Sequence, residues 1–136
     1  ILPIDAVVAD KLEFGVESFT VDLKDIIKKN MILDVGEKTV ELISNAIINS
    51  KTLLWNGPLG VFEIPPFDQA TSSCALTTAM MTRAGGLVSV AGGGDTVAAL
   101  NNAGASGGFS YVSVAGGAFL EWLEGKTLPG IVVLTD

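Results

Sequence analysis

Three times along this chain, a short apolar segment runs into a glycine-containing turn and then into a segment with helical periodicity. The apolar segments are 52–55, 87–90 and 111–114, and the turns that follow them are 56–60, 92–96 and 116–118. Strands that alternate with helices in this way are typical of a parallel sheet covered by helices on both faces. The sequence therefore predicts an α/β fold of three layers, α/β/α, with a mainly parallel, Rossmann-like sheet.

The other elements are predicted from composition and period. Residues 3–9 are rich in Val and Ile and predict a buried strand, whereas polar and apolar residues alternate in 11–25, which predicts a loop or edge segment. From Glu37 onward the apolar residues recur on one helical face. Further helices are predicted over 66–83, 95–102 and 118–124, a flexible turn over 104–108, and a final strand or tail over 131–134.

Composition argues against several classes of function. The 136 residues are 49% hydrophobic, which is enough apolar material for one core. Their net charge of −7 argues against nucleic acid or an anionic membrane as partner. The chain has no histidine, so a His-dependent triad or a His-ligated zinc site cannot form within it. Cys74 is the single cysteine, which predicts a buried apolar role and a reducing, cytoplasmic location. Because the chain begins without Met, inside an expected strand, we expect material upstream.

The glycine turns carry the most chemical information. In an open parallel sheet, all strand-to-helix turns lie at the carboxyl edge, where ligands bind. Glycine lets a ligand approach the backbone, and the N–H groups at helix starts attract anions. Three such turns, one of which contains Asp95 and Thr96, favour a phosphate-binding site over ordinary tight turns. Asp95 has two open interpretations, a helix N-cap or a carboxylate that shares a divalent metal with phosphate oxygens.

Other motifs are absent or out of place. The sequence contains neither a P-loop nor a dinucleotide-binding fingerprint. Residues 104–108 match the G-x-S-x-G pattern of hydrolases, but they follow a helix, and no histidine exists to activate Ser106. Trp55 and Trp122 could each stack on a base, although core packing is the preferred prediction for both.

The segment 55–63, W-N-G-P-L-G-V-F-E, resembles the nucleotide-domain signature of the phosphoglycerate kinase family. Segments 2–10, 92–96 and 116–130 resemble further family segments in the same order, so the resemblance covers nearly the whole chain. It implies reversible phosphoryl transfer between 1,3-bisphosphoglycerate and Mg·ADP, which gives 3-phosphoglycerate and ATP in glycolysis. It further implies that residues 1–136 are the C-terminal portion of the nucleotide-binding domain, without the N-terminal substrate domain and the upstream strands. The full-length enzyme is expected to be a cytoplasmic monomer.

The resemblance also implies the residues of the site. The nucleotide cleft would be formed by Leu33, Asn56, Gly57, Pro58, Val61, Glu63, Gly92, Asp95 and Thr96. Within that set, Leu33 and Val61 would pack against adenine. Glu63 would accept hydrogen bonds from the ribose hydroxyls, and Asp95 would ligate the Mg²⁺ on the nucleotide phosphates. The backbone facing the transferring phosphoryl group would be that of Gly93, Gly94, Thr96, Gly116 and Gly117. A chain without histidine fits this chemistry, because phosphoryl transfer depends mainly on alignment and charge neutralisation.

Two departures from the family pattern bear on function. The third glycine block usually begins Thr-Gly, but here Val114 and Ala115 precede Gly116. A positive φ at Ala115 would cost about 1 kcal/mol. The cationic groups that hold the acid substrate in the family lie outside this chain, so alone it is expected to bind nucleotide weakly and to turn over nothing. A non-catalytic nucleotide-binding module of the same fold remains an alternative.

Overall fold

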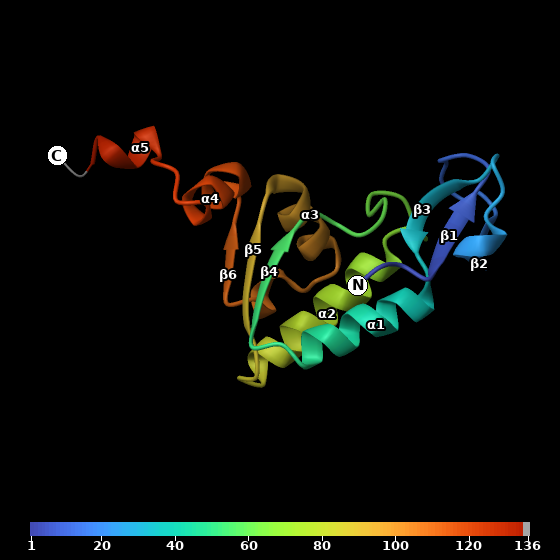
Figure 1. Cartoon of the computed structure of the whole chain (residues 1–136), viewed down its shortest axis with the longest axis horizontal. Helices are drawn as coiled ribbons and strands as arrows, with labels where there is room; N and C mark the ends of the chain where they lie inside the picture. The colour runs from blue at the N-terminus through green and yellow to red at the C-terminus, as the bar shows by residue number, and fades with distance from the viewer. Residues whose placement is uncertain (135–136) are drawn as a thin grey trace.

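The computed structural model describes residues 1–134, which form two small sheets with helices packed around them (Figure 1). The first sheet is antiparallel, with the order β2-β1-β3, and consists of β1 (Asp5–Ala9), β2 (Ser18–Asp22) and β3 (Met31–Val35). The second is parallel, with the order β4-β5-β6, and consists of β4 (Thr52–Asn56), β5 (Val88–Gly92) and β6 (Tyr111–Ser113). The helices are α1 (Glu37–Ile48), α2 (Gln69–Arg83), α3 (Gly94–Asn102), α4 (Gly116–Leu123) and α5 (Pro129–Val132), with 3-10 turns at Leu23–Asp25 and Ser106–Gly108.

The predicted α/β class, with helices layered on a parallel sheet, is confirmed. Helices α1 and α2 run side by side from the antiparallel sheet to the parallel one (Figure 1). The sequence did not predict the antiparallel sheet. Its strand β2 lies within the segment 11–25, which was predicted as a loop or edge segment, and β2 is an edge strand of this sheet. None of the helices described within residues 1–134 is long and apolar enough to cross a bilayer.

The core of the parallel sheet is built from small residues and one large ring. Cys74 and Ala75 of α2 have no exposed surface and pack with Ala91 of β5 and Leu100 of α3. Trp55 is buried, meets Phe109 edge-on at 6.2 Å between ring centroids, and donates its indole N–H to the Gly57 carbonyl at 2.6 Å. Both the buried role predicted for Cys74 and the core position predicted for Trp55 are confirmed.

Two local predictions differ from the structure, at Trp122 and at the last described residues. Trp122 is 58% exposed and stacks on Phe119 instead of entering the core. Phe119 itself lies against Gly92 of β5, so Trp122 is one helical turn beyond the contact between α4 and the sheet. Residues 104–108 form the predicted turn, which includes a 3-10 helix and packs closely, since a Cβ on Gly108 would lie 2.5 Å from that of Ala79. Residues 129–132 form the helix α5, where a strand or tail was predicted over 131–134, since Pro129 occupies a first helical position, at which its missing N–H carries no penalty.

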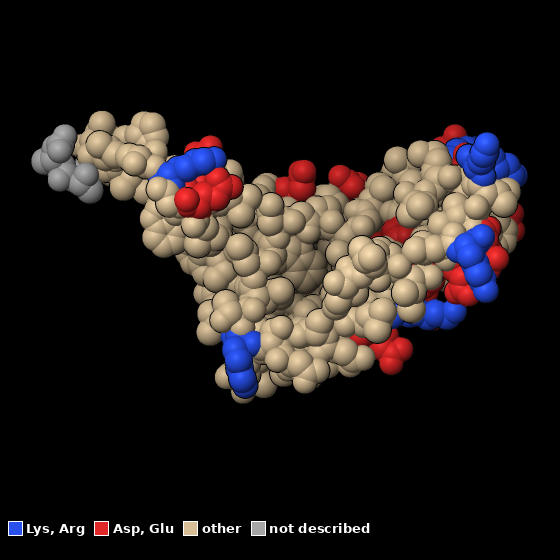
Figure 2. All heavy atoms as spheres, viewed as in Figure 1, with Lys and Arg blue, Asp and Glu red and all other residues tan. Residues whose placement is uncertain are grey.

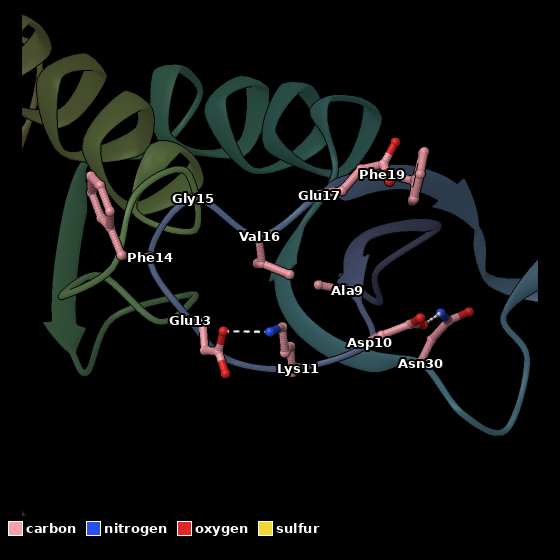
Figure 3. Close-up of a pocket in the computed structure, with 10 residues that line it drawn as sticks. All are labelled: Ala9, Asp10, Lys11, Glu13, Phe14, Gly15, Val16, Glu17, Phe19 and Asn30. Atoms are coloured by element: carbon pink, nitrogen blue, oxygen red, sulfur yellow. Dashed lines mark hydrogen bonds and ion pairs between the residues drawn. The ribbon is translucent and has the colours of Figure 1, made fainter.

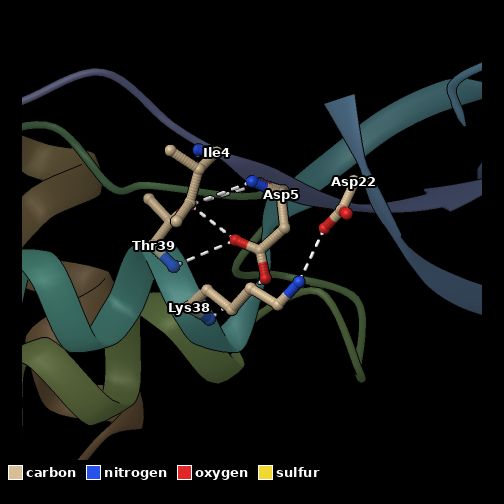
Figure 4. A network of polar contacts seen from close by, with 5 residues as sticks. All are labelled: Ile4, Asp5, Asp22, Lys38 and Thr39. Atoms are coloured by element: carbon tan, nitrogen blue, oxygen red, sulfur yellow. Dashed lines mark hydrogen bonds and ion pairs between the residues drawn. The ribbon is translucent and has the colours of Figure 1, made fainter. Parts of the chain in front are cut away.

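The start of α1 is held by a carboxylate from the antiparallel sheet (Figure 4). Asp5 of β1 accepts hydrogen bonds from the backbone N–H groups of Lys38 and Thr39, at 3.0 and 2.9 Å, and from the Thr39 hydroxyl at 2.6 Å. Gly36 packs against this carboxylate, and a Cβ there would overlap it. Burial acts to raise the pKa of Asp5, but these hydrogen bonds together outweigh it and hold the pKa below 3.8.

We expect the substitution Asp5→Asn to lower the free energy of unfolding by about 1–3 kcal/mol, because buried N–H donors of α1 lose an acceptor. The lowered pKa means that the stability from Asp5 is complete above pH 3.8 and is lost as the pH falls below that value. Denaturant unfolding at neutral and acidic pH measures both effects. Asp22→Asn is the control, since Asp22 makes only an exposed ion pair with Lys38, and equal losses from the two variants would contradict the capping role.

Candidate functional site

The carboxyl ends of the three parallel strands lie in one row. In the register of the sheet, Asn56 of β4 pairs with Gly92 of β5, and Gly92 pairs with Ser113 of β6. Helices α3 and α4 begin directly after β5 and β6, so their N-terminal turns lie at the same edge of the sheet (Figure 1). The structure thus brings together the segments around Asn56, Asp95 and Gly116, which we call the glycine rim.

Three contacts tie these segments to one another. The backbone N–H of Gly57 donates to the Thr96 hydroxyl at 2.8 Å, and that of Gly93 donates to the Ser113 carbonyl at 3.1 Å. The Cα of Gly116 approaches the backbone of Gly93 so closely that a Cβ on Gly116 would overlap it. The glycine rim is therefore fixed by the protein's own contacts. Thr96 as a whole is 2% exposed, and its hydroxyl is occupied by the Gly57 N–H, so its side chain serves to fix the rim.

The glycines of the rim fall into two groups. Gly93 has φ 107°, which favours glycine, and it is the cap residue of α3; Gly92 and Gly116 are buried by their neighbours. By contrast, a Cβ on Gly94 or Gly117 would meet no atom within 4 Å. The first turns of α3 and α4 are thus open to the outside at Gly94 and Gly117, where helix N–H groups face an approaching anion.

Ala115 does not adopt the positive φ that would destabilise the fold. Its φ is −92°, and no non-glycine residue in the described part of the chain has a positive φ. Its N–H donates to the Ser113 hydroxyl at 3.2 Å. The replacement of the family's glycine by alanine at this position therefore introduces no left-handed strain.

Asp95 occupies the second position of α3 and is exposed. Since the cap of this helix is Gly93, the N-cap interpretation of Asp95 is wrong. A carboxylate in the first helical turn is favoured by the helix dipole and remains available to a ligand. Across residues 1–134 no group of three or more Asp, Glu, Cys or His side chains could hold a metal ion. A metal at Asp95 would therefore take its other ligands from water and from a bound molecule.

The residues predicted to contact a base and its ribose adjoin the rim through the turn that follows β4. The N–H of Val61 donates to the Leu33 carbonyl at 2.9 Å, which joins the two predicted base contacts directly. Leu33 is only 5% exposed and packs with Ala9 and Phe67, whereas Val61 is half-buried. Pro58 is half-buried and Asn56 and Glu63 are exposed, so they are accessible at the surface.

Positive charge is scarce around the glycine rim. None of the eight Lys and Arg residues lies in the segments 56–60, 92–96 or 113–118. On the face shown in Figure 2 the surface is hollowed in the middle, and the Lys and Arg atoms gather toward its ends. An anion bound at the rim by this chain would therefore depend on backbone N–H groups and on a metal ion.

A separate pocket of about 380 Å³ lies beside the antiparallel sheet (Figure 3). The loop after β1 surrounds it, with Ala9 and Val16 pointing inward and a Lys11–Glu13 ion pair of 2.5 Å on its edge. Both inward residues pack in the cluster that contains Leu33. The pocket contains none of the predicted site residues, so it is distinct from the glycine rim.

The two groups of glycines give opposite predictions for stability. Gly116→Ala should lower the free energy of unfolding by about 1–3 kcal/mol, because the added methyl group overlaps the backbone of Gly93. Gly117→Ala adds its methyl group to open space within a helix and should leave stability unchanged or raise it by up to about 1 kcal/mol. Thermal unfolding of the two variants measures the difference. Equal stability of Gly116→Ala and Gly117→Ala would contradict the close contact between β5 and α4.

Comparison with known proteins supports the resemblance in the sequence. The family model of phosphoglycerate kinase matches residues 1–126. Phosphoglycerate kinases of Cereibacter sphaeroides and Mesorhizobium japonicum are 59% and 60% identical over 134 residues, which are 98% of this chain and 34% of theirs. The solved phosphoglycerate kinase of Coxiella burnetii matches with a TM-score of 0.89 and 42% identity over 98% of this chain and 34% of that one. That of Pyrococcus horikoshii matches with a TM-score of 0.79 and 28% identity, over 98% and 32%. The chain spans about a third of the length of these relatives, and it belongs to the phosphoglycerate kinase family.

Proposed function

We propose that this chain supplies the nucleotide side of a phosphotransferase. The reaction is the reversible transfer of a phosphoryl group between 1,3-bisphosphoglycerate and Mg·ADP, which yields 3-phosphoglycerate and ATP in glycolysis. Residues 1–136 correspond in this proposal to the C-terminal portion of the nucleotide-binding domain, and the acid substrate is held by a domain outside this chain. The enzyme at its full natural length is proposed to act as a monomer in the cytoplasm.

The observation that carries this proposal is the glycine rim. Two helices begin there side by side, and the Gly57–Thr96 and Gly93–Ser113 hydrogen bonds hold the three turns in place. Backbone N–H groups that are already fixed lose little freedom when they bind a charged group, and they are most effective where negative charge develops. The open positions Gly94 and Gly117 leave room for phosphate oxygens next to both helix starts.

Asp95 fits a role toward Mg²⁺. Its carboxylate is exposed, is not used as a helix cap, and offers the oxygen ligand that this ion prefers. A single protein carboxylate is sufficient, because Mg²⁺ in nucleotide sites is held largely by substrate phosphates and water. When bound, the ion would neutralise charge on the phosphates. The residues of this chain then align the nucleotide, since Asp95 and the amides of Gly93 and Gly94 belong to one helical turn.

The base is proposed to lie against Val61, with Leu33 behind it. The half-buried Val61 offers apolar surface, and the buried Leu33 supports it through their backbone hydrogen bond. The exposed Glu63, two residues beyond Val61, accepts hydrogen bonds from the ribose hydroxyls, and Asn56, Gly57 and Pro58 line the space between base and phosphates.

The chain provides no cation at the rim, so the charge of the acid substrate must be met by groups elsewhere in the protein. A non-catalytic nucleotide-binding module of the same fold would lack those groups. Val114 and Ala115, which replace a hydroxyl and a glycine of the family pattern, are the sequence feature that favours this alternative. The φ of −92° at Ala115 means that the alanine adds no left-handed strain, which supports the enzyme.

The substitution Asp95→Ala tests the metal role in the protein at its full natural length. We expect kcat/KM at limiting Mg²⁺ to fall about tenfold or more, since the variant lacks the carboxylate that positions the ion. Raising the Mg²⁺ concentration should restore part of the loss. Steady-state kinetics across a range of Mg²⁺ concentrations provides the measurement.

Glu121→Ala is the matched control for this experiment. Glu121 is an exposed acid on α4 that lies outside the proposed nucleotide site. The control should retain the wild-type dependence on Mg²⁺. A wild-type dependence in Asp95→Ala as well would rule out the proposed role of Asp95.

A further inference from the structure

Two buried aspartates on adjacent strands hold the starts of two helices. Asp5 of β1 is 1% exposed and Asp34 of β3 is 2% exposed. Asp5 accepts from backbone N–H groups of α1, and Asp34 accepts from the N–H of Ala70 in the first turn of α2 at 3.0 Å. A glycine packs against each carboxylate, Gly36 against Asp5 and Gly60 against Asp34. The two sites are thus built in the same way, but they support different parts of the molecule.

Asp34 stands next to the proposed base contacts. It directly follows Leu33, and Gly60, whose Cβ would overlap its carboxylate, directly precedes Val61. Leu33 and Val61 are themselves joined by a backbone hydrogen bond of 2.9 Å. The other oxygen of Asp34 accepts from its neighbouring Val35 N–H at 2.8 Å. The carboxylate therefore connects β3, the turn after β4 and the start of α2 at the point where the two base contacts meet.

No positive charge compensates Asp34. Burial raises its pKa to about 6, although the hydrogen bonds from Ala70 and Val35 oppose the shift and the nearby Asp68 adds to it. Glu37 at the start of α1 lines the same pocket as Asp34, and the thiol of Cys74 on α2 is near enough to be affected by its charge. Because the pKa is raised, the ionised form costs stability, and the free energy of unfolding decreases as the pH rises from 3.8 through about 6. A group that weakens the fold at neutral pH is expected at functional positions.

We propose that Asp34 is a positioning residue of the nucleotide site. By holding β3, Gly60 and Ala70 together, it fixes Val61, with Leu33 behind it, as the surface on which the base lies. This inference rests on the proposed function. Asp34 touches no reacting group, since it is buried behind the base contacts. Its effect is on the geometry of the surface that receives the base.

The experiment compares wild type, Asp34→Asn and Asp5→Asn at full natural length. The probe is adenosine, which has a base and a ribose but no phosphate, and its Kd is measured by NMR titration alongside the kinetic constants. Asp34→Asn should weaken adenosine binding and raise the KM for ADP by about fivefold or more, the range typical of coupling between a remote group and a ligand. The KM for the acid substrate should stay near the wild-type value.

Asp5→Asn is the matched control, because Asp5 has the same burial and the same role at a helix start but does not adjoin the base contacts. It should lower stability and leave the Kd for adenosine unchanged. Equal adenosine affinities in wild type and Asp34→Asn, or equal weakening in both variants, would overturn the inference. A wild type that binds neither adenosine nor Mg·ADP defeats the proposed function and the inference with it.

A pH series on the wild type decides the matter if Asp34→Asn does not fold. A protonated carboxyl has only one good acceptor oxygen, so one of the hydrogen bonds from Val35 and Ala70 weakens. Adenosine affinity should therefore fall as the pH is lowered through about 6, the pKa of Asp34. An affinity that stays flat from pH 7.5 to 5 would overturn the proposal.

Discussion

Contact between the backbones of Gly93 and Gly116 holds β5 and α4 together at the edge where the parallel strands end. No side chain fits between them, since a Cβ on Gly116 would overlap Gly93. This close approach, with the Gly93–Ser113 hydrogen bond, sets the starts of α3 and α4 next to each other. Everything proposed for phosphate binding depends on it, because two separated helix starts could not bind one polyphosphate.

The site combines this rigid rim with a second support behind the base contacts. The segments of the rim contain no Lys or Arg, so their attraction for an anion comes from aligned peptide groups. Behind Leu33 and Val61, a buried carboxylate without a counter-charge links a strand, a turn and a helix. Each support acts through the backbone, which suits a reaction in which alignment matters more than a covalent protein group.

Features with a local signal were predictable from the sequence. The apolar runs at 52–55 and 87–90 predicted strands, and the glycines after them predicted the rim, because parallel strands place their carboxyl ends at one edge. The burial predicted for 52–55 was wrong for most of the strand, since β4 lies at the edge of the sheet and Leu54 is 46% exposed. Contacts between residues far apart in the sequence leave no local pattern that could predict them. Thr96 meets Gly57 across 39 positions and Asp34 meets Ala70 across 36, so neither role could be derived from spacing. Trp122 was predicted in the core because helical spacing alone does not show which face of a helix is covered.

Backbone NMR during a titration with Mg·ADP tests the central claim most directly. If the glycine rim holds the nucleotide phosphates, the amide signals of Gly93, Gly94, Gly116 and Gly117 shift together with those of Asn56, Glu63 and Asp95. The signals of β2, at the far edge of the antiparallel sheet, stay in place. A folded protein in which Mg·ADP leaves the amides of the rim unshifted, or shifts only those of the antiparallel sheet, would contradict the account.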